Sequence, residues 1–457
     1  MFRTDQEELS IDTALNFIDD YKKNLGRYKM LEEYYAGKHS ILHRLKDPNQ
    51  ANNKIVDNYP KYITDMLTGY FMGLEVKYSA KNDDVKPLVE SLNDVFDLNT
   101  EKRENFKVAK TCSIKGDCYE VLYVNADGKI KFRKLEPENC FLVFDTTIEN
   151  HLMHGVRFYQ DELVDEKGQK QVIDYVDIYD KDKIRYYENS SGNYRLVDEQ
   201  QHYFGEVPII HFVNNEEGTG DFEHVISIID AYNAAQSNTL NDMDDFSDAY
   251  LLLVNMLATD KEDIDKLKRD KVLLLDAEGK AEWLTKEVND TWVENMKNRL
   301  NQDIHKFSFT PDMTDENFGS NVSGVSLKYK LLGMEQLRKT KEGYFEQALK
   351  RRIRLISNIL DKKSNSNSEY GFKDIEIKFN NSLPQNELEL AQIVQILSSL
   401  LSEETLLSKL PDIDDPLAEM ERKKQEEEEN IESSMITYKS LGAEHNHEEE
   451  ELLEEAK

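Results

Sequence analysis

Apolar side chains recur every three or four residues through the opening part of the chain, which is the spacing of one buried helix face. Helices are therefore predicted at about 15–25, 60–72, 85–96 and 102–114. Near Asp117 the spacing changes to two residues, which is typical of half-buried strands. We expect a β-rich block from there to about Asn215, opening with a hairpin that turns at Asn125–Gly128.

The second half of the chain alternates between helical patterns and short breaks. The predicted elements are a helix (223–257), a small β insert (260–290), a second helix (291–309) and a polar loop (310–324). A very long helix (325–363), a strand (374–380) and two further helices (388–400 and beyond Pro416) follow. The insert should contain strands at 271–276 and 281–288 around the turn AEGK. The long helix would span roughly 55–60 Å, more than a lone compact globule needs. The pattern predicts an α+β fold, mainly α.

The composition narrows the class of protein. The 457 residues are enough for two or three domains. Only 39% are hydrophobic and 32% are charged, which fits an elongated subunit that buries surface against copies of itself. The formal net charge of −32 argues against a protein that coats nucleic acid through a basic surface. With 9 Pro and 19 Gly, the chain is neither collagen-like nor a low-complexity chain.

Signals for export are not found in this sequence. The N-terminus lacks the apolar core of a secretory signal, and the apolar-rich stretch 390–402 is shorter than the ~20 residues of a membrane span. Three cysteines (Cys112, Cys118 and Cys140) exclude a disulfide framework and fit a reducing compartment, where buried packing is their expected role. We expect a soluble protein made in a cytoplasm. Acidic runs after Ile431 predict a solvated or disordered end.

Catalytic and metal-binding patterns are weak. Signatures of nucleotide-binding loops, serine hydrolases and zinc proteases do not occur. His445 and His447 could bind a metal together with the following glutamates, but a solvated tail is the simpler interpretation. His151 and His154 have the spacing of a helical metal pair, yet they lie in a strand-like region. We therefore predict no enzymatic activity, no metal site and no cofactor.

Two charged clusters have both a functional and a structural interpretation. The run at Asn241–Asp248 could bind a cation, but it lacks the order and the central Gly of a calcium loop. The basic run Lys350–Arg354 could contact phosphates, or it could pair with acidic neighbours on a helix face. We favour a solvated helix face for the first cluster and ion pairing for the second.

A set of segments occurs in an order and spacing that identify a family more specifically than any one of them does. They are YYAGKHSIL, NNKIVDNYPKYITDMLTGYFMGLEVKY, GEVPIIHFVNNEEGTGDFEHVISIIDAYN, SNTLNDMDDFSDAYLLL, NVSGVSLKYKL, NSLPQNELE and SEETLLSKLPDIDDPLAEMER. Together they resemble the portal (head–tail connector) proteins of tailed bacteriophages, of the type found in siphophages of Gram-positive hosts. The resemblance covers nearly the whole chain to about residue 430.

The resemblance implies that the chain is an elongated portal-type subunit. Its first parts would be a helical and then β-rich wing (1–232), a stem helix (233–259), a clip (260–290) and a second stem helix (291–309). These would be followed by a tunnel loop (310–324), a long wing helix with a strand (325–383), a crown (384–430) and an acidic tail (431–457). The tail matches no family pattern, and we expect it to be disordered.

The resemblance also implies a function. Twelve copies would form a ring with a central channel at the unique capsid vertex, for genome packaging, DNA translocation, head–tail joining and genome ejection. The implied partners are the terminase large subunit, an adaptor (head-completion) protein, scaffolding and major capsid proteins, and weakly and non-specifically bound double-stranded DNA, but no membrane. The ring would assemble in the host cytoplasm and enter the virion, and overexpressed rings could close with another subunit number. The alternative is an acidic cytosolic binding protein that mimics DNA, and oligomeric state separates the two.

Two sets of residues are expected to carry this function. The tunnel loop would meet DNA through Thr314, Asn317, Gly319, Ser320, Asn321, Val322, Ser323 and Gly324. The clip would dock the motor and the adaptor through Asp276, Ala277, Glu278, Gly279 and Lys280. A polar, uncharged loop suits a conduit, because each Lys or Arg on a phosphate tightens non-specific binding. Outward apolar residues of the long helix and of the stem helices are expected to bury surface between subunits, and Leu349 and Ile356 represent the long helix.

Overall fold

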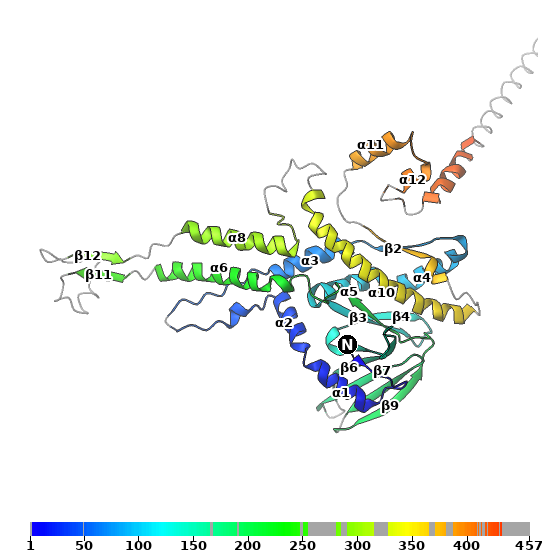
Figure 1. Ribbon diagram of the computed structural model, residues 1–457, viewed down its shortest axis with the longest axis horizontal. Helices are drawn as coiled ribbons and strands as arrows, with labels where there is room; N and C mark the ends of the chain where they lie inside the picture. The colour runs from blue at the N-terminus through cyan, green and yellow to red at the C-terminus, as the bar shows by residue number, and fades with distance from the viewer. Residues whose placement is uncertain are drawn as a thin grey trace, which may run out of the picture. The chain divides into compact units, whose positions relative to one another are not determined.

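The computed structural model describes most of the chain. The described residues are 2–48, 50–164, 168–189, 192–246, 250–254, 280–284, 290–314, 328–364, 371–380, 387–408, 410, 413, 416–417, 419–428 and 430–431. The chain divides into two compact units, 1–382 and 383–457, and each is described by itself. Figure 1 shows the elements in chain order. Every helix in the described part falls short of the length and apolarity that crossing a membrane requires.

The helices predicted in the opening part of the chain are confirmed. They are α1 (Ile11–Lys22), α2 (Leu25–Tyr35), α3 (Tyr59–Met72), α4 (Lys86–Asn99) and α5 (Glu101–Lys115). The first predicted helix is divided in two, because α1 ends before Asn24. Local signals explain the ends: Ser10 and Asn58 cap α1 and α3 with their side chains, and Gly116 closes α5 in the left-handed conformation.

The β-rich block contains a six-stranded sheet, which we call the wing sheet. Its strands, in spatial order, are β1 (Phe2–Arg3), β5 (Cys140–Phe144), β6 (Leu152–Val164), β7 (Lys170–Tyr179), β8 (Lys183–Asn189) and β9 (Tyr194–Gln201). Only β1 runs parallel to its neighbour. Helix α1 covers one face, where Ile18 packs with Phe141, Val156 and Val176. Of these strands, β1 and β5 were not predicted.

A second sheet carries the main core. Strands β3 (Asp117–Val124) and β4 (Ile130–Leu135) form the predicted hairpin, and β10 (Ile209–Val213) pairs with the other edge of β3. Gly128 has a φ of 71°, as the tight turn requires. A third, two-stranded sheet joins β2 (Val76–Ala80) to the predicted strand β13 (Ile375–Phe379). Short 3-10 turns occur at Ser40–His43, Asp83–Val85, Pro137–Asn139 and Gly371–Asp374.

The long helix is confirmed as α10 (Leu332–Ser364), which packs on β10, α3 and α4. Residues 328–330 are also helical and are separated from α10 by a turn at Leu331. The interface assigned to this helix is wrong at two positions. Leu349 and Ile356 are fully buried in the core of their own subunit, so they are not available to a neighbour. The apolar spacing gave the buried face correctly, but spacing cannot distinguish an internal partner from a second copy.

Two helices pack side by side and form what we call the stem pair (Figure 1). They are α6 (Ile226–Phe246), which follows a short turn at Glu223–Val225, and α8 (Asp290–Ser308), which confirms the helix predicted at 291–309. The helix predicted to reach Leu257 is wrong at residues 250–254. Strand β11 (Tyr250–Val254) lies there instead and pairs with β12 (Lys280–Leu284). The run YLLLV satisfies helical and strand spacing equally well, and a partner strand nearly thirty residues away decides between them.

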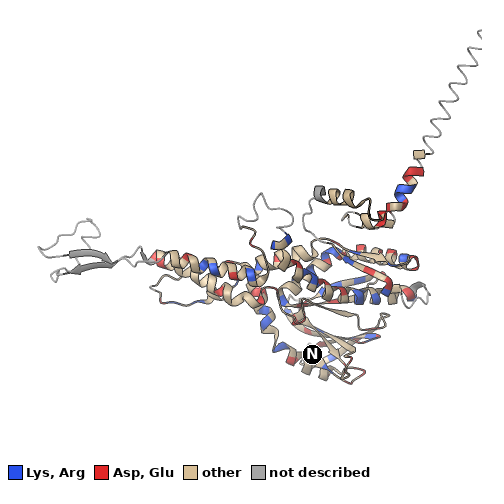
Figure 2. Ribbon diagram, turned by 45° about the horizontal axis from the view of Figure 1, so that its top comes forward, with Lys and Arg blue, Asp and Glu red and all other residues tan. Residues whose placement is uncertain are grey.

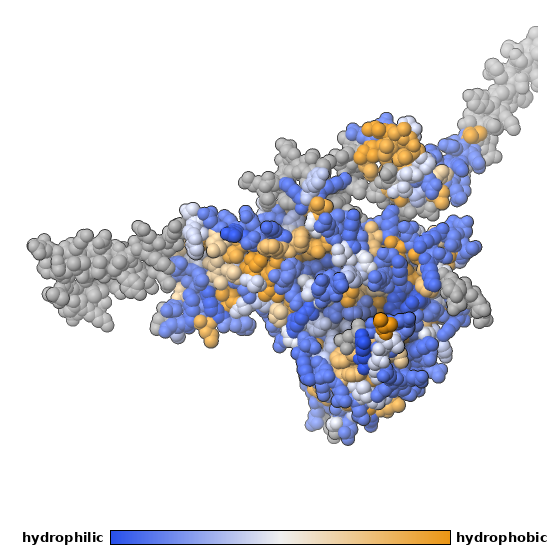
Figure 3. Space-filling view, in the orientation of Figure 1, coloured by the Kyte–Doolittle hydropathy of each residue, from blue (hydrophilic) through white to orange (hydrophobic). Residues whose placement is uncertain are grey.

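Beyond residue 383 the predicted helices are also present. They are α11 (Glu387–Leu397) and the helical residues 416–417, 419–428 and 430–431, while α12 (Glu403–Leu407) was not predicted. Apolar side chains gather over α11 (Figure 3). Ile396 and Leu400 there are 70% and 76% exposed.

Candidate functional site

An irregular segment, residues 44–57, lies along α6, and we call it the stem strap (Figure 1). The backbone N–H groups of Asn53, Ile55 and Asp57 donate to the side-chain oxygens of Asn241, Ser237 and Asn233, at 2.7, 2.9 and 2.9 Å. The donors are two residues apart and the acceptors four. Two residues of extended chain span about 6.6 Å and four residues of helix about 6.0 Å, so the two repeats match.

The stem strap changes the interpretation of the polar cluster at 241–248. Asn241 is only 3% exposed and accepts from the backbone and the side chain of Asn53. Asp244 accepts from the Asn53 amide group at 2.6 Å, and Arg44 donates to Asn238 at 2.9 Å. Among the described residues of this cluster, Asn241 is therefore not part of a solvated face but one of the polar groups that hold the strap.

The stem pair is joined to α3 at its base. Lys297 of α8 donates to Gln236 of α6 at 3.4 Å. Tyr59 of α3 donates to Asn301 of α8 at 2.6 Å, and its ring lies edge-on to Tyr232 of α6 with centroids 5.4 Å apart. The three helices are thereby fixed to one another where the expected tunnel loop begins.

The first end of the tunnel loop is ordered by hydrogen bonds. Phe309 has a φ of 53°, which turns the chain out of α8. His305 lies 2.9 Å from the Thr310 carbonyl oxygen, and Tyr62 donates to the Pro311 carbonyl at 2.7 Å. These contacts bury Thr310 to 1% exposure, so the chain leaves the helix along a defined path.

Asp312 fixes the next turn of this segment. Its carboxylate accepts from the backbone and hydroxyl groups of Thr314 at 2.9 and 2.6 Å, and from Asn301 at 3.3 Å. Burial opposes the charge, but these hydrogen bonds outweigh it and hold the pKa of Asp312 below its usual value. Thr314 is thus held in place by a charged acceptor.

The second end of the loop returns to the same place. A Cβ added to Gly333 would lie 2.9 Å from the Phe309 ring, so the ring and the start of α10 are in contact. Tyr70 of α3 donates to Glu335 at 2.7 Å, and Glu335 is paired with Arg338. The two helix ends that flank the loop, at Phe309 and Gly333, therefore meet beside α3 and α8, and we call residues 309–314 and 328–335 the loop anchor.

Of the predicted loop residues, the structure describes only Thr314. The others (Asn317, Gly319, Ser320, Asn321, Val322, Ser323 and Gly324) lie outside the described residues. In the predicted clip, Lys280 opens β12, and Asp276, Ala277, Glu278 and Gly279 lie outside the described residues, as does the predicted strand 271–276.

The turn that leads into α6 is clamped from three sides. Asp221 accepts from Lys341 of α10 at 2.5 Å and from Ser113 of α5, all three being buried. Arg27 of α2 forms an ion pair with Glu223 at 2.6 Å. A Cβ at Gly220 would lie 2.3 Å from a backbone oxygen of α5, so only Gly fits this approach. The stem pair is therefore held firmly by the body of the subunit.

The basic run of α10 pairs with carboxylates, as predicted, but only Lys350 pairs with a neighbour on the same helix, Glu346, and the arginines pair with carboxylates of other segments. Arg352, with no exposed surface, makes two 2.7 Å bonds to Glu120 and one of 3.0 Å to Glu101. Arg351 and Arg354 share Glu206, at 2.9 and 2.7 Å. Basic and acidic residues are interspersed along the elements of residues 1–382 (Figure 2). This run is not a phosphate site.

The histidine and cysteine patterns have structural explanations. Both ring nitrogens of His154 contact oxygens within the chain, and His151 contacts Asp145 and Glu149. The three cysteines are buried and form no disulfide, as predicted. No cluster of three or more potential metal ligands occurs in the part of the chain that the structure describes. His445 and His447 lie outside that part.

Comparison with known proteins identifies the family. The profile "Phage portal protein, SPP1 Gp6-like" matches residues 15–433. The portal protein of Bacillus phage SPP1 is 24% identical over 406 residues, covering 84% of this chain and 78% of that protein. The portal protein of Clostridium phage phiCD119 is 26% identical over 436 residues, covering 89% and 93%.

A solved structure, described as the neck of an empty GTA particle computed with C6 symmetry, aligns over 76% of this chain and 88% of its own. The TM-score is 0.42 and the identity 10%, values too low to support an argument by themselves. The profile and the two relatives do not depend on it. The chain therefore belongs to the SPP1 Gp6-like family of phage portal proteins.

Proposed function

We propose that copies of this portal protein form a ring whose channel conducts double-stranded DNA at the unique capsid vertex. The ring would serve genome packaging, head–tail joining and genome ejection. The observation that carries the proposal is the loop anchor: in a portal-family chain, the two helix ends that flank the loop are fixed at the base of the stem pair. A loop held at both ends by a rigid scaffold can contact moving DNA while it keeps its position in the channel wall.

The channel is proposed to be lined by Thr314, Asn317, Gly319, Ser320, Asn321, Val322, Ser323 and Gly324. These residues are small or polar and uncharged, and the chain as a whole carries a net charge of −32. DNA would therefore pass with little attraction to the wall, whereas one cation per subunit would be repeated around the ring. The expected ring contains twelve copies.

Exposed apolar side chains on α8 support the proposal of a surface for a neighbouring copy. Trp292, Met296 and Phe307 are 62%, 41% and 46% exposed. At 100° per residue they lie within about 60° of one another around the helix, and about 100° from Lys297, which faces α6. We call them the α8 flank. A ring that closes through identical head-to-tail contacts needs such a lateral apolar surface on every subunit.

Residues 260–290 are proposed as the clip, which docks the terminase large subunit and later an adaptor protein. The paired strands β11 and β12 would lie at its base, and Asp276–Lys280, which ends with the first residue of β12, would carry the docking surface. Removing 276–280 should leave rings intact and abolish adaptor binding. Adaptor binding that survives the deletion would place the docking surface elsewhere.

The remaining parts complete the assignment. Residues 1–232 and 325–383 would form the wing, which scaffolding and capsid proteins contact, 384–430 the crown, and 431–457 an acidic tail. Portal proteins are virion components, and we expect this one to assemble in the host cytoplasm before it enters the capsid. The proposal assigns no catalytic step, cofactor or metal to the chain, because the motor would be a separate protein.

A packaging assay tests the conduit. Asn321→Arg adds one positive charge per subunit and should slow DNA packaging into procapsids, and the defect should become smaller as salt screens the phosphates. Asn321→Ser keeps a polar, uncharged group and should package like the unmodified protein. An Arg variant that packages normally at low salt would show that this loop does not meet the DNA.

A further inference from the structure

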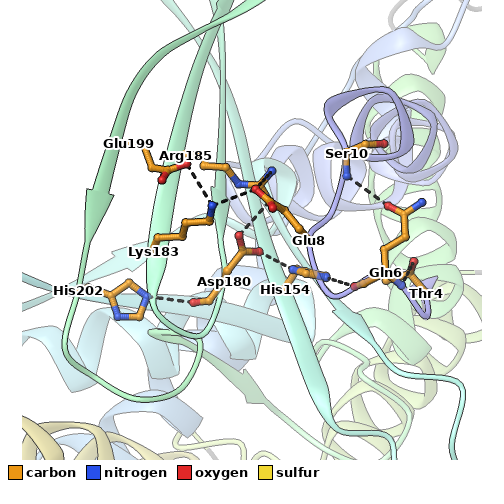
Figure 4. Close-up of polar contacts among 10 residues, drawn as sticks. All are labelled: Thr4, Gln6, Glu8, Ser10, His154, Asp180, Lys183, Arg185, Glu199 and His202. Atoms are coloured by element: carbon orange, nitrogen blue, oxygen red, sulfur yellow. Dashed lines mark hydrogen bonds and ion pairs between the residues drawn. The ribbon is translucent and has the colours of Figure 1, made fainter.

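The N-terminal segment crosses several strands of the wing sheet before α1 begins. The Thr4 N–H donates to the Phe144 carbonyl beside β5 at 2.9 Å, and Leu9 is fully buried against the sheet. Between these points the segment is held by side chains of β6 and β8 and of the turn between β7 and β8 (Figure 4). We call residues 4–9 the N-terminal arm.

The central contact is made by His154 of β6, which is fully buried. Its Nδ1 lies 2.5 Å from Oδ1 of Asp180, and its Nε2 lies 2.9 Å from the backbone oxygen of Gln6. A backbone oxygen and an ionised carboxylate can only accept hydrogen bonds, whereas a neutral imidazole has a single N–H. Both contacts together therefore need one proton more than neutral histidine and ionised aspartate provide.

The neighbouring contacts place that proton between His154 and Asp180. Oδ2 of Asp180 accepts from Arg185 at 2.9 Å, and a guanidinium keeps its protons, so Oδ2 carries none and the additional proton lies in the contact between Nδ1 and Oδ1. Lys183 contacts both Glu8 and Glu199, at 2.9 and 3.2 Å. With His154 doubly protonated, three cations (His154, Lys183 and Arg185) face three anions (Glu8, Asp180 and Glu199).

The other titratable groups around this cluster have settled charges. The hydrogen bond from Lys183, with the charge of Arg185, holds the pKa of Glu8 below its usual value. Burial lowers the pKa of His202, whose Nε2 lies 2.9 Å from the Asp180 carbonyl oxygen. On the other side, β5 presents the uncharged Val143 opposite His154. His154 is therefore the group whose charge decides the contact with the arm.

We propose that the N-terminal arm is a proton-dependent latch, closed on the wing sheet by doubly protonated His154 and opened when that proton leaves. After deprotonation, the ring nitrogen without hydrogen faces either the Asp180 carboxylate or the Gln6 carbonyl, so one of the two contacts becomes repulsive in either tautomer. The closed arm binds one proton more than the open arm, so its stability falls as the pH rises. This inference does not depend on the proposed function.

Hydrogen exchange of the full chain tests the latch. Exchange rates of the amides at residues 4–9 are measured at about pH 5.5 and about pH 8.5, on either side of the usual histidine titration, and divided by the intrinsic rate at each pH. In the unmodified protein, protection should fall by about tenfold or more at the higher pH, as expected for losing a charge-assisted hydrogen bond. Equal protection at the two pH values would overturn the proposal.

Variants distinguish the effect of the proton on the arm from a general effect on folding. In Asp180→Asn, the amide N–H can donate to Nδ1 of a neutral His154 while its oxygen still accepts from Arg185. The arm should then stay closed at both pH values. His154→Gln should leave it open at both, and His202→Gln, the control, should keep the pH dependence of the unmodified protein. A folded Asp180→Asn variant, judged by protection of α10, that remains equally pH-dependent would contradict the latch.

Discussion

At the scale of single residues, the buried guanidinium of Arg352 joins α10 to elements far earlier in the sequence, namely α5, β3 and β4. It binds Glu120 of β3 and Glu101 and Asn105 of α5, and it lies over the Phe132 ring with 4.5 Å to the centroid. Burial raises the pKa of Glu120, and the charge of Arg352 opposes that rise. The guanidinium therefore permits two carboxylates to be buried in one core.

Replacing this guanidinium should destabilise the fold in a pH-dependent way. Arg352→Met leaves buried carboxylates without a cation, at a cost of about 3–5 kcal/mol near neutral pH. The pKa of Glu120 should rise further above its unfolded value, so the variant should lose stability as the pH increases through that range. Thermal unfolding at mildly acidic and mildly alkaline pH measures both effects.

Lys350→Met is the matched control. Lys350 pairs with Glu346 on the surface, where both side chains are more than a third exposed. Its loss should change stability by no more than about 1 kcal/mol at either pH. Equal destabilisation by the two variants would mean that Arg352 contributes no more than a surface ion pair.

Single-residue roles were predictable only where the partner is local, as for Lys350, which pairs with Glu346 four residues away. The arginines of the same run were also expected to pair with neighbours on the helix, but Arg351 and Arg352 pair with Glu206 and Glu120, far earlier in the chain. The roles of Asn233, Ser237 and Asn241 were missed, because their partners lie about 180 residues earlier in the stem strap. A signal existed in the spacing: polar residues four apart on α6 match alternate positions from Asn53 to Asp57.

At the scale of elements, the stem strap binds α6 much as a strand binds its neighbour, but with side-chain acceptors. Ser237 and Asn233 have no exposed surface, so their bonds to the strap are shielded from water. A backbone N–H left without its acceptor there would lose a buried hydrogen bond, which costs about 1–3 kcal/mol. The strap should therefore depend on these side chains.

Ser237→Ala should loosen the strap without unfolding the subunit. We expect the Ile55 amide, and its neighbours two residues away, to exchange hydrogen faster by about tenfold. Asn238→Ala is the control, since Asn238 is exposed and accepts from the Arg44 side chain rather than from a backbone N–H of the strap. If exchange at Ile55 is the same in both variants, the hydrogen bonds from the strap backbone to the side chains of α6 do not hold the strap.

Elements were predicted well where capping or turn signals accompany the spacing. Pro60 and Gly73 bracket α3, and Asn125–Gly128 turns the β3–β4 hairpin. The helix expected to reach Leu257 failed because YLLLV has no such signal and its partner β12 is distant. Strand β2 was missed for the same reason, since it pairs with β13 about 300 residues later. Local periodicity carries no information about which distant strand a segment will pair with.

At the scale of the whole molecule, the family assignment requires a surface that a second copy can cover. The residues first assigned to that surface, Leu349 and Ile356, are buried within the subunit. The stem helices were also expected to contribute to that surface, and the exposed α8 flank is the part that we retain. The net charge of −32 opposes association, so apolar burial must outweigh repulsion between subunits.

Met296→Glu should weaken ring formation while the subunit stays folded. It places a charge in apolar surface that the ring would bury, and one such charge is repeated in every subunit. Gln302→Glu makes the same change of charge at an exposed position about 120° away around α8 and should assemble normally. Sedimentation of both variants against the unmodified chain measures the difference, and equal assembly would exclude the α8 flank from the interface.

The central claim is that copies of this chain close into a ring around a channel. Electron-microscope images of the purified full-length protein test it most directly, across a range of protein and salt concentrations. We expect closed rings with a central hole, and twelvefold or a neighbouring symmetry in class averages. A monodisperse monomer under every condition would contradict the account.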